Sequence, residues 1–191
     1  MNAAPLLALD DLACLRGGRL LFEGLSLRLG PGDAALIGGP NGSGKSSLLR
    51  IVAGLLRPAA GKVTRSVLPA LADEAAALDE RLTLGRALGF WARIDGVSAE
   101  PGIEAMGIAH LRDVPVRMLS AGQRKRAALA RVAASGALLW LLDEPANALD
   151  SDGRALLSAA MAAQRARGGA VLAASHQPLG LDDAAVVRLG G

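Results

Sequence analysis

Aromatic residues and cysteine are nearly missing from this 191-residue sequence. It contains no Tyr, two Phe, two Trp and a single cysteine, Cys14. One cysteine forms neither an intramolecular disulfide nor a thiolate metal site, and its isolation fits a reducing compartment. Ala and Gly are correspondingly frequent. We attribute this bias to genomic base composition rather than to function.

Long apolar runs and a strong charge of one sign are missing as well. The net charge is +3, with a pI near 9.7, and scattered arginines do not form the basic stripe of a nucleic-acid-binding protein. The longest uncharged stretch, residues 168–181, is too short for the ~18 apolar residues of a membrane span. Residues 1–11 lack a basic start and include Asp10 and Asp11, unlike a secretion signal. We therefore expect a soluble chain whose membrane role, if any, comes through a partner.

The most informative stretch is a glycine-rich segment at residues 39–46. It reads Gly-Pro-Asn-Gly-Ser-Gly-Lys-Ser, a complete Gly-x-x-x-x-Gly-Lys-Ser phosphate-binding loop. Glycines let the backbone curl around anionic oxygens, so that several N–H groups point at a β-phosphate. Lys45 would supply a cation for the β- and γ-phosphates, and the Ser46 hydroxyl is placed to bind Mg²⁺.

The residues on either side support a phosphate-binding loop. The apolar residues 34–37 are typical of a buried strand, and residues 46–56 have apolar side chains at helical spacing, with Leu55 and Leu56 among those expected in the core. The positive end of this helix dipole would face the phosphates. An ordinary glycine-rich turn is the alternative, but it does not explain a strand, loop and helix in this order.

The order of the remaining elements indicates an α/β fold. Strands are expected at residues 6–15, 25–29, 61–66, 67–71, 138–142 and 170–174. Residues 75–134 have a helical pattern, with breaks at Asp95-Gly96 and Pro101-Gly102, and residues 152–167 form an amphipathic helix. We therefore predict a single domain, residues 1–191. A catalytic core with a parallel sheet and N-terminal antiparallel strands (1–74 and 135–191) would carry an inserted small α-helical lobe (75–134).

Two carboxylates end the apolar segment at residues 138–142. Side chains at the carboxyl end of a parallel strand meet a ligand at the sheet edge. Asp143 would hold Mg²⁺, directly or through water, and Glu144 would polarise a water molecule for attack on the γ-phosphorus. Taken alone, the segment fits equally well a strand that ends at a solvated acidic turn. The phosphate-binding loop favours the chemical interpretation.

Residues 119–131 suggest a second anion site. Ser120 suits the N-cap of the helix-forming run that follows it. Ser120 and Gly122 at a helix start offer a hydroxyl, bare N–H groups and the positive end of a dipole. On its own, this segment is better explained as a capped helix with a basic solvated face. The segment lies shortly before Asp143 in the sequence, and this placement is part of the family resemblance described next.

Together these elements resemble the ATP-binding cassette (ABC) family, over nearly the whole chain. Residues 119–123, Leu-Ser-Ala-Gly-Gln, are similar to the family's LSGGQ signature, which separates it from GTPases, kinases and other P-loop proteins. Residues 39–46 match Walker A and 139–143 match Walker B. Residues 147–150 are similar to the D-loop, with Asn147 for the usual Ser. The resemblance implies that ATP is bound by Gly39, Pro40, Asn41, Gly42, Ser43, Gly44, Lys45, Ser46, Ser47 and Arg16.

The resemblance also implies roles for the other polar residues. Glu144, His176 and Lys45 would be catalytic, with His176 at the position of the family's switch histidine. Ser46 and Asp143 would bind Mg²⁺. The family forms a two-subunit sandwich, so the expected assembly is a homodimer with ATP and Mg²⁺ as cofactors. The ATP of one copy would be contacted by the signature of the other, through Ser120, Ala121, Gly122 and Gln123.

Three shorter segments are similar to the branch of this family that exports haem in cytochrome c maturation. They are residues 16–22, 119–126 and 175–179. This implies ATP hydrolysis coupled to transport, integral membrane permease subunits as partners, a peripheral place on the cytoplasmic face of the inner membrane, and no direct contact with nucleic acid. The alternatives are a soluble ABC-type ATPase acting on nucleic acid or ribosomes, and a weakly hydrolysing nucleotide-binding regulatory module.

The sequence departs from the family pattern at two places. No Gln follows the predicted strand at residues 67–71, where the family has its Q-loop, so Asp73 or Glu74 would have to act instead. The aromatic residue that often stacks on adenine is replaced by Arg16. Its guanidinium either stacks on the base or is simply a solvated group at a strand end.

Phe90 and Trp91 are adjacent in the predicted helical lobe. They would either border a groove for a helix of a membrane subunit or pack the core of the lobe. Packing is favoured, because buried aromatic side chains usually serve it.

Overall fold

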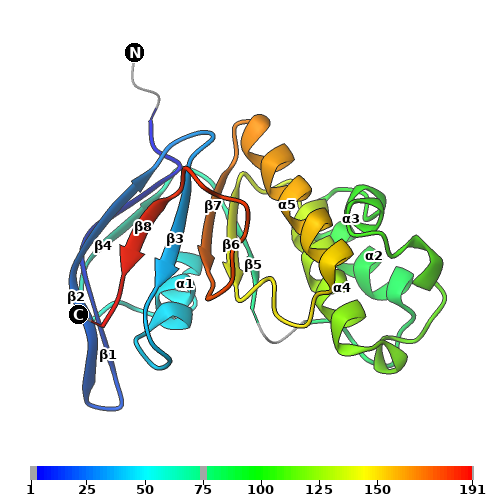
Figure 1. Cartoon of the computed structure of the whole chain (residues 1–191), viewed down its shortest axis with the longest axis horizontal. Coiled ribbons are helices and arrows are strands. Elements are labelled where there is room, and N and C mark those ends of the chain that lie inside the picture. The colour runs from blue at the N-terminus through cyan, green and yellow to red at the C-terminus, as the bar shows by residue number, and fades with distance from the viewer. Residues whose placement is uncertain (1–3, 74–76, 191) are drawn as a thin grey trace.

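The computed structural model describes residues 4–73 and 77–190. An antiparallel sheet, a parallel sheet and a group of helices follow one another across the molecule (Figure 1). The predicted α/β fold with a parallel sheet, antiparallel strands and a helical region is therefore confirmed.

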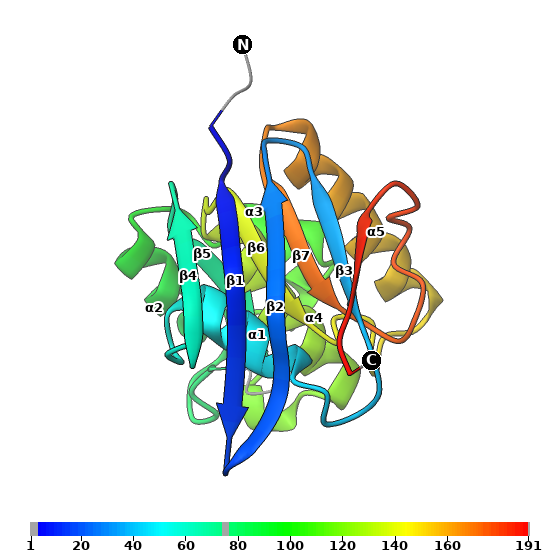
Figure 2. The ribbon, with the colours of Figure 1, turned by 90° about the vertical axis from the view of Figure 1, so that its left-hand side faces the viewer.

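The antiparallel sheet has the order β2-β1-β4, formed by β1 (Leu7–Arg16), β2 (Arg19–Leu29) and β4 (Ala60–Arg65). The turn between β1 and β2 consists of Gly17 and Gly18, with φ of 54° and 78°. Glycine adopts such positive values without a steric penalty, which makes the tight hairpin possible. The turn pairs Arg16 with Arg19 and so fixes Arg16 near the hairpin tip, at the lower end of the molecule in Figure 2.

The parallel sheet has the order β5-β6-β7-β3-β8. Its strands are β5 (Pro69–Ala72), β6 (Leu139–Asp143), β7 (Ala170–Ala174), β3 (Ala34–Gly38) and β8 (Ala185–Arg188). The central strands β6 and β7 are buried on both faces, which explains why their sequences are continuously apolar. Along β6, Leu139 and Leu141 pack into one core cluster, and Trp140 and Leu142 into the other.

The helices occupy the two sides of the parallel sheet. α1 (Lys45–Ala53) contributes Leu48 and Leu49 to the cluster that joins both sheets. The other helices lie on the opposite side (Figure 1). They are α2 (Leu84–Asp95), α3 (Glu100–Ala105), α4 (Ala121–Ala134) and α5 (Ser151–Ala166), with short 3-10 turns at Ala109–Leu111 and Val116–Met118.

The end of α1 corrects one expectation. The helix stops at Gly54, whose φ of 83° is left-handed and whose N–H donates to the carbonyls of Arg50 and Ile51. This is a glycine C-cap, and it turns the chain away from the core. Leu55, expected in the core, is consequently 70% exposed.

A second correction concerns the break expected at Pro101-Gly102. These residues lie inside α3, with Pro101 in the first turn, where a proline removes no helical hydrogen bond. A Cβ on Gly102 would lie 2.0 Å from the carbonyl oxygen of Ala130, so the glycine serves close packing of α3 on α4. The predicted division into a core (1–74 and 135–191) and a lobe (75–134) stays a prediction, and residues 74–76 at its first boundary lie outside the described residues.

Candidate nucleotide-binding site

Three loops converge at one edge of the parallel sheet. β6, β7 and β3 are neighbours and run parallel, so the loops that follow their carboxyl ends meet there. They enclose a cleft of about 570 Å³, a usual size for a small-molecule site. The described residues that line it are Arg16, Leu21, Asn41, Gly42, Gly44, Lys45, Ser46, Ser47, Asp143, Glu144, Asn147 and His176.

The loop between β3 and α1 requires glycine at several positions. Gly39, Gly42 and Gly44 have φ of 143°, 79° and 103°, values that other residues rarely adopt. A Cβ on Gly39 would lie 2.4 Å from the carbonyl oxygen of Leu189, and one on Gly44 would lie 3.0 Å from the ring of Phe22. Backbone conformation and close packing therefore both select glycine here.

Lys45 curls back over this loop. Its side-chain Nζ donates to the carbonyl oxygens of Gly39 at 2.8 Å and Pro40 at 3.1 Å, and the residue is only 8% exposed. Ser43 is buried nearby, and its Oγ has no hydrogen-bond partner among the described residues. A cation bonded only to neutral carbonyls, at the start of a helix, is suited to an incoming anion.

Glu144 and His176 meet at the mouth of the cleft. β6 ends at Asp143, which is 4% exposed, and Glu144 then turns the chain with a φ of 43°. The Glu144 N–H donates to the carbonyl oxygen of Ala174 at 2.8 Å. His176 Nε2 lies 3.4 Å from Glu144 Oε1, and the main-chain N–H of His176 donates to Oε2 at 3.4 Å. Two of the three predicted catalytic residues, Glu144 and His176, are therefore neighbours.

Ser120 caps α4 in the predicted manner. Its Oγ accepts from the Gln123 N–H at 3.2 Å, and Gln123 Oε1 accepts from the Ser120 N–H at 2.9 Å, which forms a reciprocal capping box. A Cβ on Gly122 would lie 2.8 Å from the carbonyl oxygen of Ala148. The glycine thus allows the start of α4 to pack against the loop at residues 147–150.

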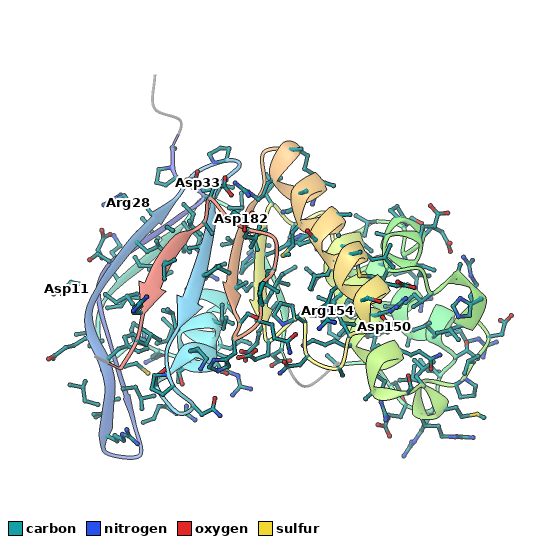
Figure 3. The ribbon with its side chains drawn as sticks, in the orientation of Figure 1. Asp11, Arg28, Asp33, Asp150, Arg154 and Asp182 are labelled. Atoms are coloured by element: carbon teal, nitrogen blue, oxygen red, sulfur yellow. The ribbon has the colours of Figure 1, made fainter. Side chains whose placement is uncertain are left out.

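The signature residues do not join the cleft around Lys45 in the same chain. Ser120, Gly122 and Gln123 line a separate cavity of about 360 Å³. Asp150, the N-cap of α5 (labelled in Figure 3), borders this second cavity. Ala121 borders a third cavity, of about 270 Å³. The two predicted anion sites of one chain therefore lie in different cavities.

The structure also shows where the two departures from the family pattern lie. Arg16 reaches the cleft from the hairpin tip, beside Leu21, while its contact with adenine stays a prediction. At the Q-loop position, Asp73 pairs with Arg50 at 3.6 Å and borders the same cavity as Glu144. Glu74, the other residue considered there, lies outside the described residues.

The sequence patterns gave no site role to two residues of this region, Leu21 and Lys125. Leu21 lines the cleft, and so does Asn147, which the sequence placed only in the D-loop. Lys125 Nζ donates to the carbonyl oxygen of Asp143 at 3.0 Å. A contact between residues that are 18 positions apart leaves no periodic signal, so only the folded chain reveals it.

Comparison with known proteins decides the family. The family model described as ABC transporter matches residues 22–147. The chain belongs to the ABC transporter ATPase family. It is 60% identical over 181 residues to the cytochrome c biogenesis ATP-binding export protein CcmA of Sphingopyxis alaskensis, with 93% of each chain covered. It is 57% identical over 176 residues to the protein of the same description from Novosphingobium aromaticivorans, with 92% and 91% covered.

Solved structures of the ABC family share this fold. An ATP-binding subunit of an ABC transporter superposes with a TM-score of 0.87 at 22% identity, covering 96% of this chain and 85% of that one. An ABC transporter ATP-binding protein from Pyrococcus furiosus superposes with a TM-score of 0.83 at 21% identity, covering 96% of both chains. These structures confirm the predicted ABC fold, while the ATP-binding function is confirmed by the family match and the curated relatives.

In this ABC ATPase, Trp91 serves mainly packing. Its Nε1 donates to the carbonyl oxygen of Ala77 at 2.7 Å, and the Arg131 guanidinium lies 4.6 Å from the centre of its ring. Phe90 packs edge-to-face against Trp91, at 5.5 Å between ring centres, but is itself 47% exposed. The two adjacent aromatic residues therefore differ, because Trp91 is partly buried and contacts Ala77 and Arg131, whereas Phe90 faces outward.

Proposed function

We propose that the chain is the ATP-hydrolysing subunit of an ABC exporter that drives haem export in cytochrome c maturation. The observation that carries this proposal is the 60% identity to a cytochrome c biogenesis export ATPase over 93% of the chain. The cleft supports it, because Walker A, Walker B and His176 converge there.

In this proposal, ATP occupies the cleft with its phosphates against the loop at residues 39–44. Lys45 exchanges its two carbonyl partners for phosphate oxygens, and backbone N–H groups of the loop donate to the β-phosphate. The adenine lies at the hairpin side of the cleft, where the Arg16 guanidinium stacks on it beside Leu21.

The residues present fit a Mg²⁺ ion. Ser46 and Asp143 line the cleft and offer a hydroxyl and a carboxylate, the oxygen ligands that Mg²⁺ prefers. Among the described residues, no group of three or more His, Cys, Asp or Glu side chains could enclose a metal. Mg²⁺ suits such a place, because it usually takes one or two protein ligands and completes its shell with phosphates and waters. When bound, it would neutralise charge on the phosphates.

Hydrolysis requires a water molecule aimed at the γ-phosphorus. Glu144, at 15% side-chain exposure and within the cleft, orients that water and accepts its proton. His176 contacts the γ-phosphate from beside Glu144. Lys45 and the loop N–H groups stabilise charge on the transferred phosphoryl group, so most of the catalysis is electrostatic.

The complete site requires two copies of the chain. Ser120 is exposed and lies outside the cleft around Lys45, so its hydroxyl is available to a neighbouring molecule. In a homodimer, the helix start at residues 120–123 of one copy would donate to the γ-phosphate held by the other. The triphosphate would then join the copies, and hydrolysis would release them.

Membrane attachment would come from integral permease subunits of a CcmB-like kind. None of the helices among the described residues has the length and apolar character to cross a bilayer. The exposed Phe90 and Ile94 on α2 offer an apolar surface for a permease helix. The chain would accordingly sit peripherally on the cytoplasmic face of the inner membrane.

Deletion of the gene in its source organism tests the transport function. We expect loss of covalently bound haem from c-type cytochromes, detected by haem staining of membrane proteins. Restoration is expected from the wild-type gene but not from Lys45→Ala, which leaves the surface of α2 intact and should still co-purify with the permease. Normal c-type cytochromes in the deletion strain would contradict the proposal.

A further inference from the structure

The peptide unit between Asp143 and Glu144 is held at both of its polar groups. The Glu144 N–H donates to the carbonyl oxygen of Ala174 at 2.8 Å. The carbonyl oxygen of Asp143 accepts from Lys125 Nζ at 3.0 Å. The two bonds fix this peptide plane and the position of the Glu144 Cα, and φ of Glu144 then sets the direction in which its side chain leaves the backbone.

That direction is not one that glutamate adopts readily. The φ of Glu144 is 43°, in the left-handed region that residues with a Cβ rarely occupy. Such a conformation persists only where the surrounding structure fixes it, and it is common at functional sites. Here it points the carboxylate into the cleft, towards His176. The bond from Lys125 is therefore one of the constraints that keep the carboxylate in place.

Lys125 comes from a different element, and that element carries the signature. α4 begins directly after Ser120, and the capping box with Gln123 fixes its start. Lys125 follows Gln123 by two positions, and its side chain spans the distance from α4 to the end of β6. It borders the cavity of about 270 Å³ together with Asp73 and Glu144. The signature helix thus touches the Walker B strand of its own chain.

We propose that Lys125 is a positioning residue for ATP hydrolysis, which holds the Asp143 carbonyl and thereby aims the Glu144 carboxylate. The proposal rests on the role of Glu144 under the proposed function. Lys125 would not bind the nucleotide. Its loss would leave ATP affinity unchanged and would slow the chemical step, because the left-handed backbone at Glu144 would relax towards commoner conformations.

Steady-state ATP hydrolysis by the full chain, with kcat and KM measured separately, tests this proposal. Lys125→Met removes the ammonium and keeps the apolar stem. We expect kcat to fall by about 10-fold or more, with KM and the Kd for ATP within about twofold of wild type. Lys125→Arg keeps a cationic donor and should recover most of kcat. Lys62→Met, an exposed lysine on β4, is the matched control and should behave as wild type.

The possible results distinguish a positioning role of Lys125 from direct binding of phosphate. A rise in Kd with Lys125→Met would mean that Lys125 binds phosphate directly and would overturn the proposal, as would an unchanged kcat. If Lys125→Met does not fold, as judged by thermal unfolding, Lys125→Ala, which favours the helix and also lacks a side-chain donor, provides the same comparison.

A double-mutant cycle then asks whether Lys125 acts through Glu144. In a Glu144→Gln background, Lys125→Met should cause no further loss of kcat, because the group that Lys125 positions is already absent. Additive losses would contradict the proposal. A wild-type chain that binds ATP without hydrolysing it would overturn the proposed function itself, whereas normal hydrolysis that is insensitive to Lys125 overturns only this inference.

Discussion

Glu144 and His176 form a pair at the mouth of the cleft, with His176 Nε2 3.4 Å from Glu144 Oε1 and the His176 main-chain N–H directed at Oε2 at 3.4 Å. Glu144 directly follows β6 and His176 follows β7, so the pair exists only because these strands are neighbours. Under the proposed function, this arrangement would place a proton acceptor and a ring N–H donor side by side, next to the γ-phosphate and the attacking water.

The first prediction concerns this pair. His176→Ala should lower kcat for ATP hydrolysis about 100-fold, because it removes a donor to the γ-phosphate and leaves Glu144 without its neighbour. The Kd for ATP, measured by equilibrium titration, should change little. His176→Gln keeps a donor and should retain more activity than His176→Ala. Equal activities of the two variants would contradict a donor role.

The phosphate-binding loop offers a matched pair of glycine substitutions. Gly39→Ala should lower the free energy of unfolding by about 3 kcal/mol, because a Cβ there lies 2.4 Å from the Leu189 carbonyl oxygen at a φ of 143°. Gly42→Ala meets no atom within 4 Å and carries only backbone strain, so about 1 kcal/mol is expected. Chemical denaturation measures both values. A larger loss for Gly42→Ala than for Gly39→Ala would contradict the packing argument.

Phe90 and Trp91 provide a test of the permease surface. Trp91→Glu should destabilise the fold, because Trp91 bonds to Ala77 and stacks with Arg131. Phe90→Glu changes an exposed ring and should leave thermal unfolding nearly unchanged, yet prevent co-purification with membranes. Retention of Phe90→Glu on membranes at the wild-type level would exclude this surface as the docking site.

The Asp150 carboxylate predicts a pH-dependent contribution to stability. It accepts from the Gly153 N–H at 2.8 Å and from Arg126 Nη2 at 2.5 Å, and these bonds, the first being the larger cause, lower the pKa of Asp150 below its ordinary value of 3.8. A carboxyl group with a lowered folded pKa stabilises the fold above its unfolded pKa and loses this effect as the pH falls through the folded pKa.

The measurement compares wild type with Asp150→Asn, which keeps an N-cap acceptor for α5 and removes the charge. Wild type should be more stable in chemical denaturation at pH 7, and the difference should shrink below about pH 4. A difference that stays constant down to about pH 2 would show that ionisation of Asp150 contributes nothing.

Much of the fold could be predicted from local patterns. The apolar runs of β3, β6 and β7 and the helical spacing in α1, α4 and α5 each depend on neighbouring residues, and their positions are confirmed to within a few residues. The errors occurred at boundaries. Leu55 continues the helical spacing of α1, but the left-handed cap at Gly54 overrides it. Conversely, Pro101 suggests a break yet lies in the first turn of a helix.

The candidate site could be predicted only in part, for a physical reason. The Walker A loop is formed by neighbouring residues, so its phosphate-binding role can be recognised from the glycines and the lysine in the sequence. The contacts of Lys125 with Asp143, and of Trp91 with Ala77, join segments that the chain brings together only after the sheet and helices have packed. The short strand β8 was missed because its four residues are partly or fully exposed and carry no buried apolar pattern.

The central claim is that two copies of this chain clamp ATP between the Walker A loop of one and the Ser120 helix start of the other. Glu144→Gln should bind ATP, hydrolyse it far more slowly than wild type, and so accumulate the closed dimer. Size-exclusion chromatography with ATP and Mg²⁺ measures this directly. The account predicts an ATP-dependent dimer of Glu144→Gln that is lost when Ser120→Arg is added. A Glu144→Gln chain that binds ATP yet remains monomeric at high protein concentration would contradict it.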